Sequence, residues 1–422
     1  MPTNPRASRP FRRGGSVGHY HPGDASPIDP AGPAGPITLA MRTLLHAFST
    51  FELGGSQARF VQLANAYGPA YRHLIVAMDG RMQAAERLAP GVNWAPMAVE
   101  NRRGGALANR SAFRQALQQW QPDLVLSYNF GAIEWAAGNL PRCVPQVHVE
   151  DGFGPGEAQR QLPRRVWARR LILGCGHASV VVPSRRLVQH AQSWWIPARR
   201  LRYIPNGVPV DAGASARPVV PAGRPLVIGT VAGLRPEKNL ARLLRAFAQA
   251  RRLHDLRLLI VGDGVARAAL QALATELGVA ADVEFTGYLR DPQARLREMD
   301  LFALSSDTEQ QPISMLEAMA LGIPVIATRV GDVPFIVPDA VSPLVLCAAD
   351  DAAFGRTLLA MLDRRDEWPQ WAAAGLDRAR SHFAFADMLQ RWRQVFDGQV
   401  AAVPDLISAP GIRPIGNAVG GR

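Results

Sequence analysis

Two glutamates, Glu309 and Glu317, stand eight residues apart in the run SSDTEQQPISMLEAMALGIPVIAT. Pro312 lies between them where a helix can begin, since its missing N–H would have had no partner in the first helical turn. The amides of Ile313 and Ser314 then belong to an open helix N-terminus, which attracts anions. Each carboxylate can accept hydrogen bonds from sugar hydroxyls. The spacing predicts a phosphate site flanked by two polyol sites, which suits a nucleotide sugar.

A second candidate site lies in the run IGTVAGLRPEKNL, residues 228–240, at the end of an expected strand. It contains Lys238, the only lysine among the 47 basic residues of the chain, of which the other 46 are arginines. An ammonium and a planar guanidinium bind anions differently and do not replace each other freely. A lysine kept here by an arginine-preferring sequence therefore indicates a specific contact.

Three further strand ends carry residues that suit ligand binding. Gly54 and Gly55 follow the first expected strand, and glycines there let backbone amides approach a phosphate or sugar. The loop VHVEDGFGPGE contains His148, whose imidazole can donate to a hydroxyl or hold a carboxylate, together with the acids Glu150 and Asp151. The run FTGYL, residues 285–289, ends a later strand with a glycine turn.

The elements that would position these residues alternate regularly. Short apolar runs, beginning at 43–48, are separated by helical patterns of about ten residues, which predicts mostly parallel sheets covered on both faces. The pattern stops in a Pro/Gly/Ala-rich stretch at 208–224 and restarts beyond it. We therefore expect an α/β fold of two Rossmann-like, doubly wound domains that face a cleft, with ligands beyond the carboxyl ends of the strands.

The Glu309-to-Glu317 run and the AMALGIPV that follows resemble the Glu-x7-Glu signature of retaining, GT-B-fold glycosyltransferases of family 4, glycosyl transferases group 1. The resemblance spans about residues 41–396 and is strongest over 226–340. It implies that a sugar moves, with retention of configuration, from a nucleotide sugar to a saccharide or lipid-linked acceptor, in the synthesis of cell-surface polysaccharide or glycolipid.

The same resemblance implies roles for individual residues. Lys238 and Arg235 would hold the donor diphosphate, on which negative charge grows during transfer. Glu317 would hold the ribose, Glu309 the donor sugar, and His148 would face the region of transfer. The other donor contacts would be Gly54, Gly55, Gly287, Tyr288, Pro312, Ile313 and Ser314, with Glu150 and Asp151 on the acceptor side.

Two departures from the family pattern affect these roles. Family members commonly have Arg where Gly233 stands, so either Arg235 reaches the diphosphate in its place or the clamp is weaker. Many members also have a glycine beside the first glutamate, where this chain has Gln310 and Gln311, so the donor sugar cannot be taken over from the family.

The expected division of the chain follows from the linker and the resemblance. It comprises a leader over 1–40, either disordered or not translated, an N-terminal acceptor-side domain over 41–207, a linker over 208–224, a C-terminal nucleotide-sugar-binding domain over 225–380, a helix over 381–403 that crosses back to the N-terminal domain, and a flexible tail over 404–422.

No cofactor or metal is expected, because the sequence has no Asp-x-Asp pair and no His/Cys cluster with ligand spacing. Two alternatives to transfer stay open. A GT-B nucleotide-sugar epimerase would use the same donor pocket without an acceptor. A non-catalytic nucleotide-sugar-binding protein would be compatible with the glycine at position 233.

Composition favours a cytoplasmic globular protein. Hydrophobic residues make up 48% of the chain, no run is long enough for a membrane-spanning helix, and the first 40 residues lack the apolar core of a signal peptide. The three widely spaced cysteines fit neither a disulfide framework nor a zinc site.

The net charge of +12 is concentrated in residues 158–210, which contain ten arginines and no acidic residue. Within it, 162–173 is a basic amphipathic stretch, which predicts either a core-facing helix with a solvated arginine face or peripheral contact with an anionic membrane. We do not expect nucleic acid as a partner, because no nucleic-acid-binding module accompanies the charge.

Overall fold

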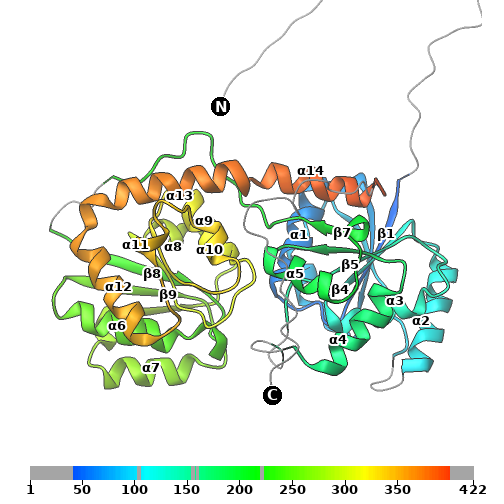
Figure 1. Cartoon of the computed structure of the whole chain (residues 1–422), viewed down its shortest axis with the longest axis horizontal. Helices are drawn as coiled ribbons and strands as arrows, with labels where there is room; N and C mark the ends of the chain where they lie inside the picture. The colour runs from blue at the N-terminus through cyan, green and yellow to red at the C-terminus, as the bar shows by residue number, and fades with distance from the viewer. Residues whose placement is uncertain (1–40, 102–105, 154–156, 158–160, 219–222, 400–422) are drawn as a thin grey trace, which may run out of the picture. The chain divides into compact units, whose positions relative to one another are not determined.

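The computed structural model describes residues 41–101, 106–153, 157, 161–218 and 223–399. The expected leader over 1–40 and the expected tail over 404–422 lie outside the described residues. The described chain forms two parallel β-sheets, of seven and six strands, each accompanied by helices (Figure 1). The predicted α/β fold with two Rossmann-like sheets is therefore confirmed.

The first sheet has the strand order β3-β2-β1-β4-β5-β6-β7, and its neighbouring strands are parallel. Central strand β1 pairs Leu45 with Leu74 on one side and with Val125 on the other. The strands are β1 (Thr43–Phe48), β2 (Arg72–Ala77), β3 (Asn93–Pro96), β4 (Leu124–Tyr128), β5 (Gln146–Val149), β6 (Ser179–Val182) and β7 (Leu201–Tyr203). The helices between them are α1 (Gly55–Tyr67), α2 (Ala106–Trp120), α3 (Glu134–Gly138), α4 (Pro163–Arg169), which continues as a π-helix over Arg170–Gly174, and α5 (Arg185–Ser193).

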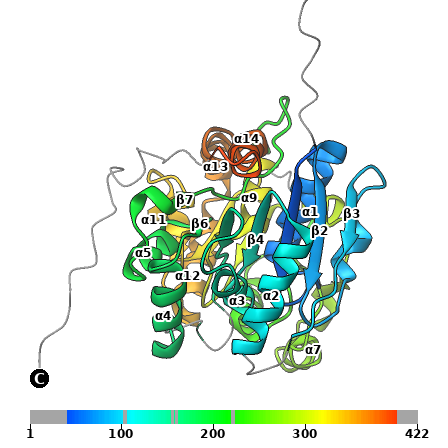
Figure 2. The same ribbon diagram turned by 90° about the vertical axis from the view of Figure 1, so that its right-hand side faces the viewer.

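Alternate residues of β1 are buried against different helices, as the period of two in a strand requires. Leu44 and Phe48 share a core cluster with residues of α1. Leu45 and Ala47 share another with residues of α2 and α3, which lie side by side (Figure 2). Burial on both faces explains why these strands read as continuous apolar runs.

The second sheet has the order β10-β9-β8-β11-β12-β13, also with parallel neighbours. Its strands are β8 (Leu226–Val231), β9 (Leu256–Val261), β10 (Val283–Gly287), β11 (Leu301–Leu304), β12 (Val325–Thr328) and β13 (Leu346–Cys347). Its helices are α6 (Leu240–Arg251), α7 (Arg267–Glu276), α8 (Gln293–Arg297), α9 (Ile313–Ala320), α10 (Val333–Ile336), α11 (Ser342–Val345), α12 (Asp351–Asp363) and α13 (Trp368–His382).

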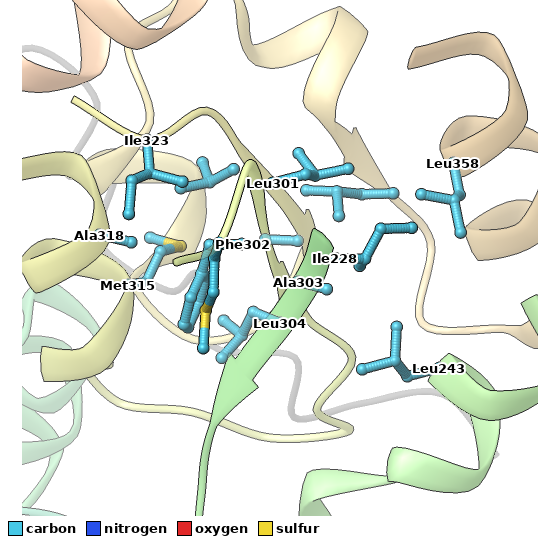
Figure 3. Close-up of a cluster of buried hydrophobic side chains, with 14 of the residues drawn as sticks. Ile228, Leu243, Leu301, Phe302, Ala303, Leu304, Met315, Ala318, Ile323 and Leu358 are labelled. Carbon is cyan, nitrogen blue, oxygen red and sulfur yellow. The ribbon is translucent and has the colours of Figure 1, made fainter. Parts of the chain in front are cut away.

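One core cluster fills the space around this second sheet. Phe302 of β11 is fully buried among side chains that include Leu243 of α6, Met315 of α9 and Leu358 of α12 (Figure 3). Burial of such a phenylalanine stabilises the fold by roughly 1.5–3 kcal/mol. The loops that follow β8 and β11 are thereby attached to a rigid scaffold.

The last helix, α14 (Phe385–Phe396), packs on the first sheet. Its Trp392 and Phe396 are buried in the core cluster that contains Leu44 of β1. Beyond the helix, Asp397 Oδ1 accepts a hydrogen bond of 2.6 Å from the hydroxyl of Tyr71. Helix α14, which follows the helices of the second sheet in the sequence, thus packs against the core of the first sheet.

Some elements differ from the sequence-based expectation. Strands β3, β7 and β13 were not expected; all three lie at sheet edges, and their sequences NWAP, LRY and LC contain no apolar run of four residues. The helix expected over 162–173 is α-helical only to Arg169 and then widens into the π-helix.

Candidate functional site

Lys238 and Glu309, 71 residues apart in the chain, form an ion pair with 2.6 Å between Nζ and Oε1. Lys238 ends a short turn after β8, and Glu309 lies in the loop after β11. The two strands are neighbours in the second sheet, so their carboxyl ends present both loops at one edge. Ser306 Oγ also donates to Glu309 Oε1, at 2.7 Å, and fixes the carboxylate.

A buried arginine supports the loop that carries Glu309. Arg242 of α6 donates from Nη1 to the carbonyl of Ser305, at 2.7 Å, and from Nη2 to Asp307, at 2.8 Å. Ser305 Oγ in turn donates to the carbonyl of Lys238, at 3.1 Å. These bonds join the β8 and β11 loops into one unit, so the two charged side chains are held together by the scaffold as well as by each other.

Helix α9 begins at Ile313, immediately after Pro312, and no side chain caps its N-terminus. Glu317 lies one turn into this helix and is partly buried. Burial, assisted by the negative charge of Asp291, raises the pKa of Glu317 to about 7. A carboxyl in this state gains most from a ligand that supplies hydroxyl donors, because such hydrogen bonds favour its charged form.

Arg235 lies in the same loop as Lys238, with an exposed side chain whose Nε is 3.1 Å from Glu237 Oε1. A Cβ built on Gly233 would lie 3.5 Å from Arg235 Nε. The side chain of Arg235 therefore lies beside Gly233, the position at which the family pattern has an arginine.

Gly287, at the end of β10, has a φ of +75°, a conformation that favours glycine. A Cβ there would lie 3.1 Å from Arg267 Nη1, and Arg267 donates to the carbonyl of Phe285, at 3.2 Å. Tyr288 follows with an exposed ring, over which the guanidinium of Arg87 stacks at 5.3 Å.

In the first half, the N-terminus of α1 is joined to the loop after β5. Gly54 precedes the helix, and Ser56 Oγ accepts a hydrogen bond of 3.4 Å from Asn129 Nδ2. Asn129 Oδ1 accepts from the amide of Asp151, at 2.8 Å, and Arg59 of α1 forms an ion pair with the Asp151 carboxylate. A Cβ on Gly55 would meet no atom within 4 Å, so its backbone borders open space.

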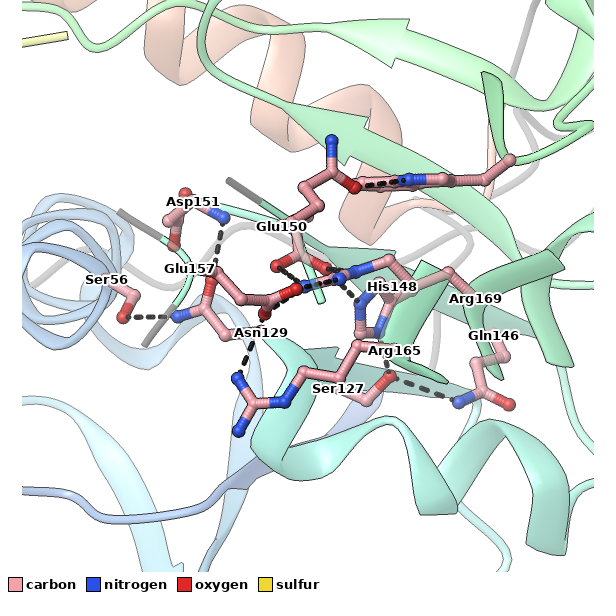
Figure 4. Close-up of polar contacts among 12 residues, drawn as sticks. Ser56, Ser127, Asn129, Gln146, His148, Glu150, Asp151, Glu157, Arg165 and Arg169 are labelled. Atoms are coloured by element: carbon pink, nitrogen blue, oxygen red, sulfur yellow. Dashed lines mark hydrogen bonds and ion pairs between the residues drawn. The ribbon is translucent and has the colours of Figure 1, made fainter. Parts of the chain in front are cut away.

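His148 and Glu150 were placed on the ligand side by the sequence analysis, but the structure buries both completely (Figure 4). His148 Nδ1 lies 3.0 Å from Ser127 Oγ, and its Nε2 lies 3.3 Å from Glu150 Oε2. Both side chains are enclosed because they belong to a polar network inside the first half. In this structure both side chains are therefore bonded to the protein itself, and their role toward a ligand stays a prediction.

Arg169 is the centre of that network (Figure 4). Its fully buried guanidinium donates to both oxygens of Glu150, at 3.2 Å each, and to both oxygens of Glu157, at 3.2 and 3.4 Å. Burial pushes the pKa of Glu150 upward, but the hydrogen bond from His148 and the charge of Arg169 hold it below its usual value. The aromatic rings within 5.3 Å of the guanidinium carbon are those of Phe130, Phe153 and Trp194.

Gln310 and Gln311, the departure from the family pattern, bond to residues of the first half. Ser184 Oγ donates to Gln310 Oε1, at 3.2 Å. Asn206 donates from its backbone amide to Gln311 Oε1 and from Nδ2 to the Gln311 carbonyl, at 3.3 Å. The loop that carries Glu309 is thus bonded to two segments that precede the expected linker.

Asp332 strengthens the same contact. Its carboxylate accepts hydrogen bonds from the backbone amides of Arg185 and Arg186, at 2.6 and 3.0 Å, and so caps α5. Burial raises the pKa of Asp332 to about 6, against the effect of these two amides. Gly331 has a φ of +54°, and a Cβ there would lie 1.8 Å from the Glu309 carbonyl, so only glycine allows this approach.

Sequence reasoning missed several of these residues. Arg169 was counted only as part of a basic stretch, although its place among apolar residues, at a spacing of four from Arg165, was a signal of burial. Arg242, in LARLLRAF, similarly interrupts an apolar helix face. Asp332 and Asn206 carried no sequence signal, because their partners lie more than 100 residues away.

No group of three or more His, Cys, Asp or Glu side chains among the described residues is arranged to hold a metal ion. None of their helices is both long enough and apolar enough to cross a membrane.

Comparison with known families gives matches in both halves. Residues 53–212 match the model described as Glycosyltransferase Family 4, and residues 225–364 match the model described as Glycosyl transferases group 1. Together the two matches cover well over half of the chain.

The curated relatives that the chain matches are named as glycosyltransferases. A GDP-mannose-dependent alpha-mannosyltransferase of Mycolicibacterium smegmatis is 41% identical over 201 residues, which are 44% of this chain and 50% of the relative. A lipopolysaccharide core biosynthesis glycosyltransferase of Rhizobium meliloti is 33% identical over 138 residues, 33% of this chain and 39% of the relative. The chain thus spans about half the length of the curated relatives that it matches.

Solved structures share the fold. The Anabaena protein HepE in complex with UDP superposes with a TM-score of 0.70 at 18% identity, over 85% of this chain and 100% of that chain. At this identity the likeness describes the arrangement of the chain and not its ligands.

Proposed function

Because the chain belongs to the family 4, group 1 glycosyltransferases with the GT-B fold, we propose that it moves a hexosyl group from a nucleotide sugar to a saccharide or lipid-linked acceptor. The observation that best supports this is the Lys238–Glu309 ion pair, four residues before the uncapped N-terminus of α9. A cation and one carboxylate then lie on the loops after β8 and β11, and the second of these loops leads into the helix that carries the other carboxylate, which suits a diphosphate with a sugar at each end.

In the proposed complex, Lys238 turns from Glu309 to the donor diphosphate. Its ammonium then stabilises the charge that grows on the leaving nucleoside diphosphate. Glu309, released from the lysine, accepts hydrogen bonds from the donor sugar. Arg235, whose stem lies beside Gly233, supplies the second cation of the clamp. Glu317 binds the ribose, whose hydroxyls restore the hydrogen bonds that its partial burial removes.

We propose that transfer retains the configuration of the donor. The acceptor hydroxyl forms its bond to the anomeric carbon on the face from which the diphosphate leaves. As the bond from that carbon to the phosphate oxygen breaks, the hydroxyl proton passes to this oxygen. No protein base is then needed, which agrees with the burial of His148 against Ser127 and Glu150.

Asp151 remains the acceptor-side candidate; its side chain is 13% exposed, its carboxylate oxygens are buried, and its ion pair with Arg59 orients it. We place the protein in the cytoplasm, where residues 158–210 would face the cytoplasmic surface of a membrane. The proposed product is a precursor of cell-surface polysaccharide or glycolipid.

A non-catalytic nucleotide-sugar-binding function is the second candidate, because Gly233 removes one arginine of the expected clamp. An epimerase differs from both, since it would change the sugar of the donor with no acceptor present.

One set of measurements separates these functions. Thermal shifts with UDP-, GDP- and ADP-sugars select the donor, which is then incubated with and without a panel of saccharide and lipid-linked acceptors. Acceptor-dependent release of nucleoside diphosphate, with a product of unchanged anomeric configuration by NMR, supports the proposal. Binding without release indicates the non-catalytic function, and a changed donor sugar without acceptor indicates an epimerase.

A further inference from the structure

Three large apolar side chains of the first half stand exposed close together in the chain's basic segment. The exposed fractions are 52% for Trp167, 59% for Leu171 and 49% for Trp195. The two indole rings meet edge to face with centroids 5.6 Å apart. The guanidinium of Arg170 stacks on both, at 5.0 Å from the Trp167 ring and 4.9 Å from the Trp195 ring. We call these four residues the aromatic patch.

The backbone is built to keep Trp195 in the patch. Its φ is +65°, a left-handed conformation that is unusual for so bulky a residue. A Cβ on Gly174 would lie 2.3 Å from the carbonyl of Trp194 and 3.2 Å from Trp195 Cβ, so the turn fits only against a glycine. The neighbouring Trp194 is fully buried against Arg169. One tryptophan anchors the turn in the core while the next is held outward.

The sequence on both sides of the patch is basic. Arg164 lies three residues before Trp167, and Arg199 lies four residues after Trp195; both are exposed. The whole segment 158–210 contains ten arginines and no Asp or Glu. A surface that joins exposed indoles to exposed arginines complements a layer that is apolar inside and anionic outside.

We propose that the aromatic patch docks on the surface of an anionic lipid bilayer. Indole rings favour the boundary between acyl chains and headgroups, where their apolar body is buried and their N–H stays hydrated. The arginines bind the phosphates of the headgroups, and Arg170 follows the indoles into this layer by stacking on them. This docking rests on the proposed membrane setting of residues 158–210, for which it names the contact residues, and it does not depend on sugar transfer.

The test is sedimentation of the full chain with vesicles, which reports binding whether or not any transfer occurs. Vesicles of phosphatidylcholine alone are compared with vesicles that contain 30% phosphatidylglycerol. We expect binding to the anionic vesicles only, with a loss of at least tenfold in the partition coefficient at 0.5 M NaCl. Equal binding to both kinds of vesicle, or to neither, overturns the proposal.

Variants locate the contact. Trp195→Asn accepts the positive φ more readily than tryptophan, so it keeps the fold, and we expect it to lower the partition coefficient about tenfold. Trp167→Ser should act similarly, and Arg164→Gln with Arg199→Gln should flatten the salt dependence. Leu253→Ser is the matched control, since Leu253 is 72% exposed on the second half, and it should bind as the native chain does.

Two outcomes of the variant series overturn the proposal. In the first, Trp195→Asn and Trp167→Ser bind anionic vesicles as tightly as Leu253→Ser. In the second, light scattering shows that the patch variants dissociate an oligomer of the native chain while vesicle binding is unchanged. The patch would then be an interface between copies of this chain.

Discussion

Lys238 Nζ lies 2.6 Å from Glu309 Oε1, so the single lysine of the chain is paired with the first of the two glutamates that define the candidate donor site. Glu309 is nearly buried, and Lys238 is its cationic partner. A diphosphate can replace the carboxylate as the partner of the ammonium. Donor binding at this site requires that exchange.

Arg169→Met should destabilise the protein by about 3–5 kcal/mol, because it leaves the buried carboxylates of Glu150 and Glu157 without their cation. Arg165→Met is the matched control; its partly exposed side chain pairs with Glu157 alone, and its loss should cost about 1 kcal/mol or less. Urea unfolding of the two variants measures both values. Equal costs would show that Arg169 does not organise the network.

His73→Leu should make the protein less sensitive to acid. Burial lowers the pKa of His73 to about 4, so this histidine is neutral in the folded protein and becomes protonated in the unfolded chain below pH 6.5. Stability is therefore fully present above pH 6.5 and is lost as the pH falls toward 4, by about 1.4 kcal/mol per pH unit. Unfolding at several pH values measures the slope.

His46 contributes to the same effect, since burial and the neighbouring His73 lower its pKa well below the usual value. Its Nδ1 and Nε2 lie 3.0 Å from Tyr128 Oη and His73 Nδ1 respectively. The leucine variant should therefore retain part of the acid slope. A variant with the full native slope would contradict the assignment.

Glu317→Gln should stabilise the protein at pH 8 and not at pH 4. The folded pKa of about 7 lies above the usual 4.5, so the folded state holds a proton that the unfolded chain has lost between these values. Native stability therefore falls as the pH rises through this window, by about 1 kcal/mol per unit after allowance for partial exposure. The glutamine lacks this slope, and unfolding at both pH values shows whether the difference appears.

The same residue should make donor binding pH-dependent. Ionised Glu317 accepts two hydroxyl hydrogen bonds, so the nucleotide should bind more tightly at pH 8 than at pH 6 and should release protons at pH 7. Calorimetry in buffers of different ionisation enthalpy counts these protons. No proton release, or tighter binding at pH 6, would remove Glu317 from the site.

The sequence predicted the parts of this molecule that depend on local pattern. Apolar runs separated by helix-length spacings predicted both sheets. The single lysine and the two glutamates eight residues apart predicted one donor site, and the structure places Lys238 in contact with Glu309. Edge strands such as β3 and β13 were missed because neither contains an apolar run long enough to predict a strand.

Burial of polar side chains could not be predicted in the same way. His148 and Glu150 follow a strand end and look available to a ligand, yet Arg169 of a later helix encloses them. Gln310 and Gln311 were recognised only as a departure from the family pattern. Their partners, Ser184 and Asn206, lie more than 100 residues earlier, and only the tertiary structure brings them together.

Calorimetric titration with UDP, GDP and ADP shows whether Lys238 binds a diphosphate, as the proposed donor site requires. For the nucleotide that the native chain binds most tightly, Lys238→Ala should raise Kd about ten- to hundredfold, the loss of one charge-assisted hydrogen bond of about 1.5–3 kcal/mol. Arg364→Ala, which removes an exposed cation paired with Glu367, should leave Kd unchanged. Equal Kd values for the native chain and Lys238→Ala, or no binding of any of the three nucleotides, would show that Lys238 does not hold a donor diphosphate.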